Sequence, residues 1–100
     1  MPDQAQADAR REFARCFGEN LVRARRAADI SQEALSFEAG VHRTEIGMLE
    51  RGVRVPLLDT AVKLASALGV PLDELVRGVE WRASVRAGGW RRATDQDAIG

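Results

Sequence analysis

Four residues in the segment RTEIGMLE have the types and spacing to contact nucleic-acid bases. Arg43 and Thr44 open the segment. An arginine can donate to guanine O6 and N7, and a threonine can contact a phosphate or a thymine methyl group. Gly47 and Met48 follow on the same outer face and offer little hydrogen bonding, so recognition there would depend on DNA shape and apolar contact. The segment therefore predicts a short helix, residues 43–50, that enters the major groove of double-stranded DNA.

Three neighbouring residues are candidates for supporting contacts. Gln32 stands at the start of the preceding helix, where exposed backbone N–H groups favour an anion such as a phosphate, although a solvated helix start is the alternative. His42 can cap the following helix weakly or touch a phosphate. Glu45 could accept from cytosine N4, but its position three residues after His42 favours a capping-box role.

The composition gives no sign of an enzyme or a metal site. The chain has one His and one Cys, so it has no zinc-ligand spacing and no internal disulfide, and we expect no cofactor. Fifteen basic residues balance fifteen acidic ones, and all but one of the basic residues are arginine. The chain thus has no overall charge with which to hold DNA non-specifically, and only the distribution of charge can favour it. No apolar run reaches membrane-spanning length, so a cytoplasmic protein is expected.

The residues around these candidates predict two helices at a fixed angle. Ser31 can cap a helix over about 32–38, and Gly40 suits the left-handed conformation that ends one. Val41 is then the apolar residue of the turn. In the second helix, Ile46 and Leu49 form the inner face that packs on the core. This is a helix-turn-helix pattern.

The flanking segments predict three further helices and an extension. Apolar residues at spacings of three and four predict a first helix over about 10–28, with residues 1–9 frayed. Gly18 weakens that helix, so its first turns need not be continuous with the rest. A strongly amphipathic helix follows at about 58–68, and a short fifth one begins at Pro71. Residues 79–100, with VEWR and GWRR, suit a small hairpin or extended arm and a disordered tail.

The motifs SQEAL, GV, RTEI, LERG, RVP and LAxALGVxLDEL together resemble the phage-repressor-like (Cro, or xenobiotic-response-element) helix-turn-helix family. The resemblance covers about Phe17 to Val76. It implies a compact, all-α, five-helix domain, residues 1–78, that binds DNA as a transcriptional regulator, commonly as a dimer. It also implies that Arg25 pairs with Glu50, that Gln32 makes a phosphate or supporting contact, and that Arg51 and Arg54 meet the DNA backbone.

We therefore expect a sequence-specific DNA-binding regulator, and a repressor because the sequence has no evident activating or ligand-sensing domain. A homodimer is expected through the fifth helix and the extension, with the residues Leu72, Leu75, Val76, Trp81 and Trp90. The alternatives are an antitoxin-like module that binds a protein partner through the C-terminal extension and DNA only secondarily, and a bridging cofactor that does not read DNA. The neutral net charge keeps both open.

Overall fold

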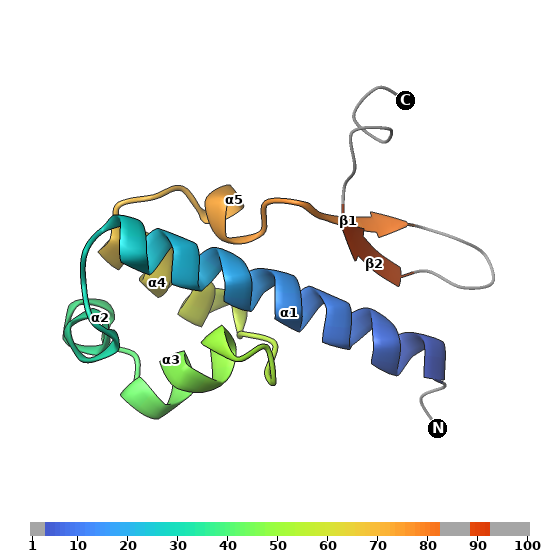
Figure 1. The fold of residues 1–100 in the computed structure, drawn as a ribbon, viewed down its shortest axis with the longest axis horizontal. Coiled ribbons are helices and arrows are strands. Elements are labelled where there is room, and N and C mark those ends of the chain that lie inside the picture. The colour runs from blue at the N-terminus through green and yellow to red at the C-terminus, as the bar shows by residue number, and fades with distance from the viewer. Residues whose placement is uncertain (1–3, 83–88, 93–100) are drawn as a thin grey trace.

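The computed structural model describes residues 4–82 and 89–92, which form five helices and two short strands (Figure 1). In chain order these are α1 (Gln4–Ala27), α2 (Gln32–Ala39), α3 (Arg43–Glu50), α4 (Leu58–Leu68), α5 (Leu72–Leu75), β1 (Val79–Arg82) and β2 (Gly89–Arg92). The predicted five-helix architecture is confirmed. The tail expected to be disordered, residues 94–100, lies outside the described residues. None of the described helices has the length and apolarity to cross a membrane.

The first helix begins six residues earlier than predicted. Residues 4–9, expected to fray, belong to α1, which runs without a break for 24 residues. Side-chain contacts one turn apart support this start: Gln4 Nε2 donates to Asp8 Oδ1 at 2.9 Å, and Arg11 pairs with Asp8 at 3.3 Å. The strand β2 also packs against α1. The apolar periodicity that marked the helix begins only at Phe13, which is why the sequence prediction began too late.

Gly18 does not interrupt α1, contrary to the prediction. It is buried where α1 crosses the end of α3, and a Cβ atom there would lie 2.4 Å from the carbonyl oxygen of Leu49 and 2.9 Å from that of Glu50. A glycine in a helix lowers its stability by about 1 kcal/mol. Here the missing side chain lets the two backbones approach closely, so Gly18 is a packing residue.

The core lies between the C-terminal half of α1 and helices α2 to α5. The side chains with no solvent exposure are Phe17, Leu21, Leu35, Ile46, Leu49, Leu64 and Leu75. Gly40 ends α2 with φ 69° and ψ 32°, and its N–H donates to Ser36 O. Val41, 7% exposed, then enters the core and fixes the turn into α3.

Asn20 is a buried polar residue that fastens α5 to α1. Its Nδ2 donates to the carbonyl oxygens of Leu75 at 3.0 Å and Arg77 at 2.9 Å, and Arg23 Nη1 donates to its Oδ1. Because α5 is a single turn, the carbonyl groups at its end and just beyond it have no partner within the helix, and the bonds from Asn20 satisfy them. The end of α5 is therefore fixed within the subunit.

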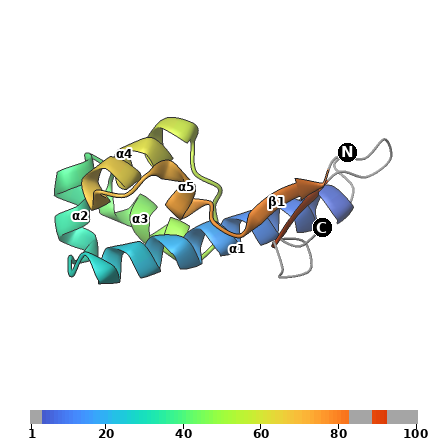
Figure 2. The ribbon, with the colours of Figure 1, turned by 90° about the horizontal axis from the view of Figure 1, so that it is seen from above.

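The two strands form an antiparallel pair in which Trp81 is opposite Trp90 and Glu80 is opposite Arg91. The segment that connects the strands, residues 83–88, lies outside the described residues. Figures 1 and 2 both place the strands beside the N-terminal half of α1, beyond the helices that surround its C-terminal half. The extension predicted as a hairpin or arm is thus a paired strand unit packed on α1.

Candidate DNA-binding surface

The exposed N-terminal turn of α3 is backed by the core. Ile46 and Leu49 are fully buried, whereas Arg43 and Thr44 are exposed. His42 begins the helix: its Nδ1 accepts a hydrogen bond from Thr44 N at 3.1 Å, so the imidazole acts as an N-cap. The rigid back of the helix fixes the position of the two exposed side chains, as recognition of base edges requires.

Two of the four predicted outer-face residues are not exposed. Gly47 is buried and Met48 is half-buried. A Cβ atom at Gly47 would lie 3.5 Å from Arg51 Nη1, so the side chain of Arg51 reaches back over the helix one turn earlier. The exposed surface of α3 is consequently narrower than predicted and concentrated at Arg43 and Thr44.

Glu50 is the centre of a network that joins three helices. Its Oε2 accepts from Arg25 Nε at 2.6 Å and its Oε1 from Arg25 Nη2 at 3.1 Å. Gln32 Nε2 donates to the same Oε1 at 2.9 Å. The side chains of Arg25 and Glu50 are 16% and 6% exposed, and the hydrogen bond to Glu50 raises the pKa of Arg25. The network locks α3 to α1 and α2, and it occupies the amide nitrogen of Gln32, for which a phosphate or supporting contact was predicted.

The loop after α3 carries Arg51 and Arg54. Both are exposed, and Arg54 Nη1 donates to Glu45 Oε1 at 2.6 Å. The predicted capping-box role of Glu45 is therefore wrong: His42 already caps the helix through its own imidazole, and the carboxylate of Glu45 reaches Arg54 instead. Exposed ion pairs of this kind are weak, and the guanidinium of Arg54 keeps further N–H groups that can donate to a phosphate.

Comparison with known proteins then identifies the fold. The helix-turn-helix family HTH_3 matches residues 21–75, which contain α2, α3, α4 and α5. The chain belongs to this family. The control protein C.BamHI of Bacillus amyloliquefaciens is 41% identical over 61 residues, which is 60% of this chain and 75% of that protein. The control protein C.SmaI of Serratia marcescens is 40% identical, over 58% of this chain and 69% of that protein.

Solved structures give the same result. The restriction-modification controller protein C.AhdI of Aeromonas hydrophila is 40% identical, with a TM-score of 0.60 over 62% of this chain and 94% of that one. A hypothetical transcription factor from Neisseria is 28% identical, with a TM-score of 0.62 over 76% of this chain and 80% of that one. The HTH_3 match fits the observed geometry and makes the chain a DNA-binding transcriptional regulator.

One of the predicted dimer residues of this HTH_3 domain is not available to a partner. Leu75 is fully buried within the subunit, because Asn20 holds the end of α5 against α1. Leu72 and Val76 are half-buried against the same core, and Trp81 is 49% exposed. The side chain of Trp90 lies outside the described part of the chain. A role of these last four residues in dimerisation stays a prediction.

Sequence reasoning missed the contacts that three residues make in this part of the fold. Asn20 lies on the apolar face of α1, and an amide at such a position needs buried partners, so that signal was present. The amide of Gln32 gives no signal of its bond to Glu50, 18 residues away. Gly52, with φ 72°, sits against the backbone of α1 at Arg15, a contact that the local sequence does not indicate.

Proposed function

We propose that this chain is a sequence-specific repressor that binds an operator in double-stranded DNA as a homodimer, with α3 in the major groove. The observation that carries the proposal is the exposed pair Arg43 and Thr44 on a helix whose opposite face is fully buried and whose last residue is locked by Arg25. A protein that occupies operator DNA can repress by occlusion, with no further contact to the transcription machinery. Because one α3 spans few base pairs, two subunits on half-sites about one helical turn apart give useful specificity.

The relatives suggest where to look for an operator. C.BamHI and C.SmaI are named control proteins, and C.AhdI is described as a restriction-modification controller. Promoter regions of restriction and modification genes are therefore the first DNA to test, beside selection of bound sequences from random DNA.

The experiment compares Arg43→Ala with the wild type on the selected operator and on a shuffled duplex of equal length. Base contacts differ between sequences, whereas phosphate contacts do not. Arg43→Ala should therefore weaken operator binding by about 1–3 kcal/mol per half-site and relax the base preference at the contacted position. Binding to the shuffled duplex should change much less.

The matched control is Arg77→Ala, which removes the same charge from an exposed residue that follows α5 and lies outside α3. Its operator binding should equal that of the wild type. Equal losses for Arg43→Ala on both duplexes would mean that Arg43 holds phosphates and does not read bases. A wild type with no preference for any sequence would instead favour a protein-interaction module.

A further inference from the structure

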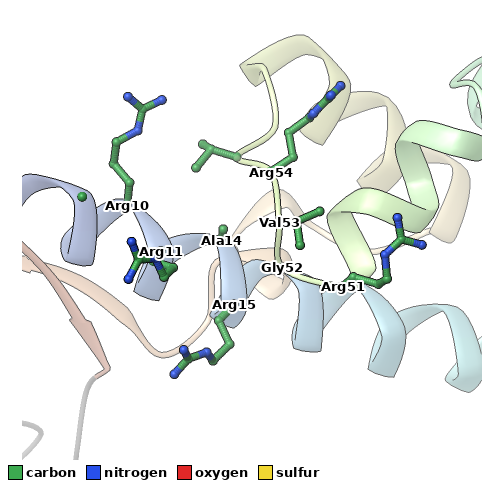
Figure 3. A pocket seen from close by; sticks show the side chains of 10 residues that line it. Arg10, Arg11, Ala14, Arg15, Arg51, Gly52, Val53 and Arg54 are labelled. Carbon is green, nitrogen blue, oxygen red and sulfur yellow. The ribbon is translucent and has the colours of Figure 1, made fainter.

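An arginine-lined groove lies between the N-terminal half of α1 and the loop after α3 (Figure 3). The groove has a volume of about 650 Å³. Its arginines are Arg10, Arg11, Arg15, Arg51 and Arg54, and its other lining residues are alanine, glycine and valine. No lining residue is acidic, although the chain as a whole is neutral. The groove thus concentrates positive charge next to the end of α3.

Gly52 brings the two walls of the groove together. With φ 72°, its backbone lies so close to α1 that a Cβ atom would be 3.0 Å from Arg15 Cα. Any side chain would strain that conformation and push the loop away from α1. The position of Arg51 and Arg54 beside the first half of α1 is therefore built into the backbone.

Nearby carboxylates pair with three of the five arginines but leave their side chains exposed. Arg11 pairs with Asp8 at 3.3 Å, Arg15 with Glu12 at 3.4 Å, and Arg54 with Glu45 at 2.6 Å. These three arginine side chains remain 52–61% exposed, and exposed ion pairs exchange readily for other partners. For Arg10 and Arg51, the described residues provide no carboxylate within ion-pair distance.

The arginines do not all extend in the same direction. In Figure 3 the side chains of Arg10, Arg51 and Arg54 extend to the side of α1 on which α3 lies, whereas Arg15 extends to the opposite side. Arg51 directly follows the last residue of α3, so this side of the groove continues the proposed DNA-reading surface. Arg10 lies outside residues 21–75, the part that matches the family.

We propose that only the α3 side of this groove, which carries Arg10, Arg51 and Arg54, binds backbone phosphates of the DNA that flanks the segment read by α3, with Arg10 as the outermost contact. Guanidinium groups form strong, charge-assisted hydrogen bonds with phosphate oxygens. An acidic protein segment would also suit the charge, but continuity with the end of α3 favours DNA. The inference rests on the proposed function, because it places the flanking DNA relative to α3.

The test compares the wild type, Arg10→Ala and Arg15→Ala on two duplexes. One is trimmed to the operator selected from random DNA, and the other extends it by about five base pairs, or half a helical turn, on each side. Arg15→Ala is the matched control, since it removes the same charge from the same helix and groove but from the side that faces away from α3. The wild type should bind the extended duplex more tightly than the trimmed one, and Arg10→Ala should lose most of that gain.

Salt dependence provides a second readout. Affinity falls as salt rises, and each phosphate contact makes the slope of log affinity against log salt more negative by about 0.9. Between about 50 and 200 mM salt, the advantage of the wild type over Arg10→Ala should therefore shrink about 3.5-fold for each phosphate that the variant no longer binds. The preference for operator over shuffled DNA should stay unchanged. Arg15→Ala should behave as the wild type in every arm.

Two outcomes overturn the inference while the proposed function survives. One is an Arg10→Ala variant that keeps the full gain on extended DNA and the wild-type salt slope. The other is equal loss in Arg10→Ala and Arg15→Ala, which indicates only general charge. If such an Arg10→Ala variant, unchanged on DNA, also binds polyglutamate more weakly than the wild type does, the groove is assigned to an acidic protein segment instead. If the wild type prefers no sequence, the proposed function fails, yet a loss specific to Arg10→Ala on shuffled DNA still supports a phosphate groove.

Discussion

At the scale of single residues, the orientation of α3 depends on one carboxylate. Glu50 ends α3 and accepts hydrogen bonds from Arg25 of α1 and Gln32 of α2, at distances between 2.6 and 3.1 Å. The bidentate geometry of the arginine pair restricts rotation of α3 as well as its distance from α1. The same contacts that position Arg43 and Thr44 therefore also hold three helices together.

Replacing Glu50 with Ala should destabilise the fold by about 1–3 kcal/mol. The half-buried guanidinium of Arg25 would lose its carboxylate and keep only the carbonyl oxygen of Ile30 as an acceptor, and the half-buried amide of Gln32 would lose its acceptor. In a domain of this size, each kcal/mol lowers the melting temperature by roughly 4–8 °C.

The pair of Arg25 with Glu50 raises the pKa of Arg25. The stability that this pair contributes is therefore fully present below the ordinary pKa of arginine and is lost only as the pH rises through the raised value. The difference in melting temperature between Glu50→Ala and the wild type should therefore persist across neutral pH.

Thermal melts monitored by circular dichroism test this, with Glu38→Ala as the control. Glu38 is an exposed carboxylate near the end of α2, and its removal should change the midpoint very little. An equal midpoint for Glu50→Ala and the wild type would mean that the network contributes nothing to stability.

The residue scale also shows what sequence can indicate. Residues 25 and 50 are too far apart for spacing to predict a pair, and only the family resemblance suggested it. The exposed Arg43 and Thr44 followed from the helical periodicity of α3. The burial of Gly47 did not, because it depends on the path of the Arg51 side chain over the helix. Local patterns indicate which face a helix exposes, but side chains reaching across it decide how much stays exposed.

At the scale of elements, the crossing of α1 and α3 determines how closely the recognition helix approaches its scaffold. Gly18 makes that crossing possible, since a methyl group there would overlap the carbonyl oxygen of Leu49. In an open helix, Gly→Ala stabilises by roughly 0.5–1 kcal/mol. Gly18 therefore lowers the stability of the isolated helix but allows the close crossing, and its sequence signal was misleading.

Gly18→Ala should destabilise by about 1–3 kcal/mol, because the backbone atoms it meets can move only by shifting a whole helix. Gly47→Ala is the matched control: it is also a glycine within a helix, but its nearest neighbour is the flexible end of Arg51, at 3.5 Å. Urea unfolding should place Gly18→Ala below the wild type and Gly47→Ala at or above it. Equal stability of the two variants would contradict the close crossing of α1 and α3.

Element boundaries were predictable where a terminating residue was present. The bounds of α3 and α4 follow from Gly40, the loop that contains Pro56, and Gly69, and Leu57 gives the start of α4 no side-chain cap. The start of α1 was missed because residues 4–9 carry no apolar periodicity. Their helix is supported by contacts within its own first turns and by β2, which comes from the far end of the chain. Only the folded molecule provides that second support.

At the scale of the whole molecule, the chain is a family domain with an added unit. Residues 21–75 match HTH_3, while the first turns of α1 and the paired strands lie outside that match and beside each other (Figure 2). The added unit extends the arginine surface beyond the domain, which neither the neutral net charge nor local periodicity predicted. The distribution of charge, and not its total, is what distinguishes this molecule as a DNA-binding protein.

An apolar surface outside the predicted dimer residues is also exposed. Leu75 is buried, but Leu57, Leu58 and Val62 at the start of α4 are 72%, 73% and 49% exposed. Leu58 and Val62 lie four residues apart and so share one face of the helix. Neighbouring exposed apolar side chains are typical of protein interfaces, whereas single ones are ordinary. If two subunits bind adjacent half-sites, this face is the one we expect to join them.

Leu58→Glu should therefore convert the proposed homodimer to a monomer, because it places a charge where the partner's apolar surface would exclude water. Phe37→Glu is the control, since Phe37 is 82% exposed on α2 and the substitution introduces the same charge on a different helix. Sedimentation at micromolar concentration should give a dimer for the wild type and Phe37→Glu but a monomer for Leu58→Glu. A dimeric Leu58→Glu variant would move the interface to Trp81 and the half-buried residues of α5, and a monomeric wild type would remove the homodimer altogether.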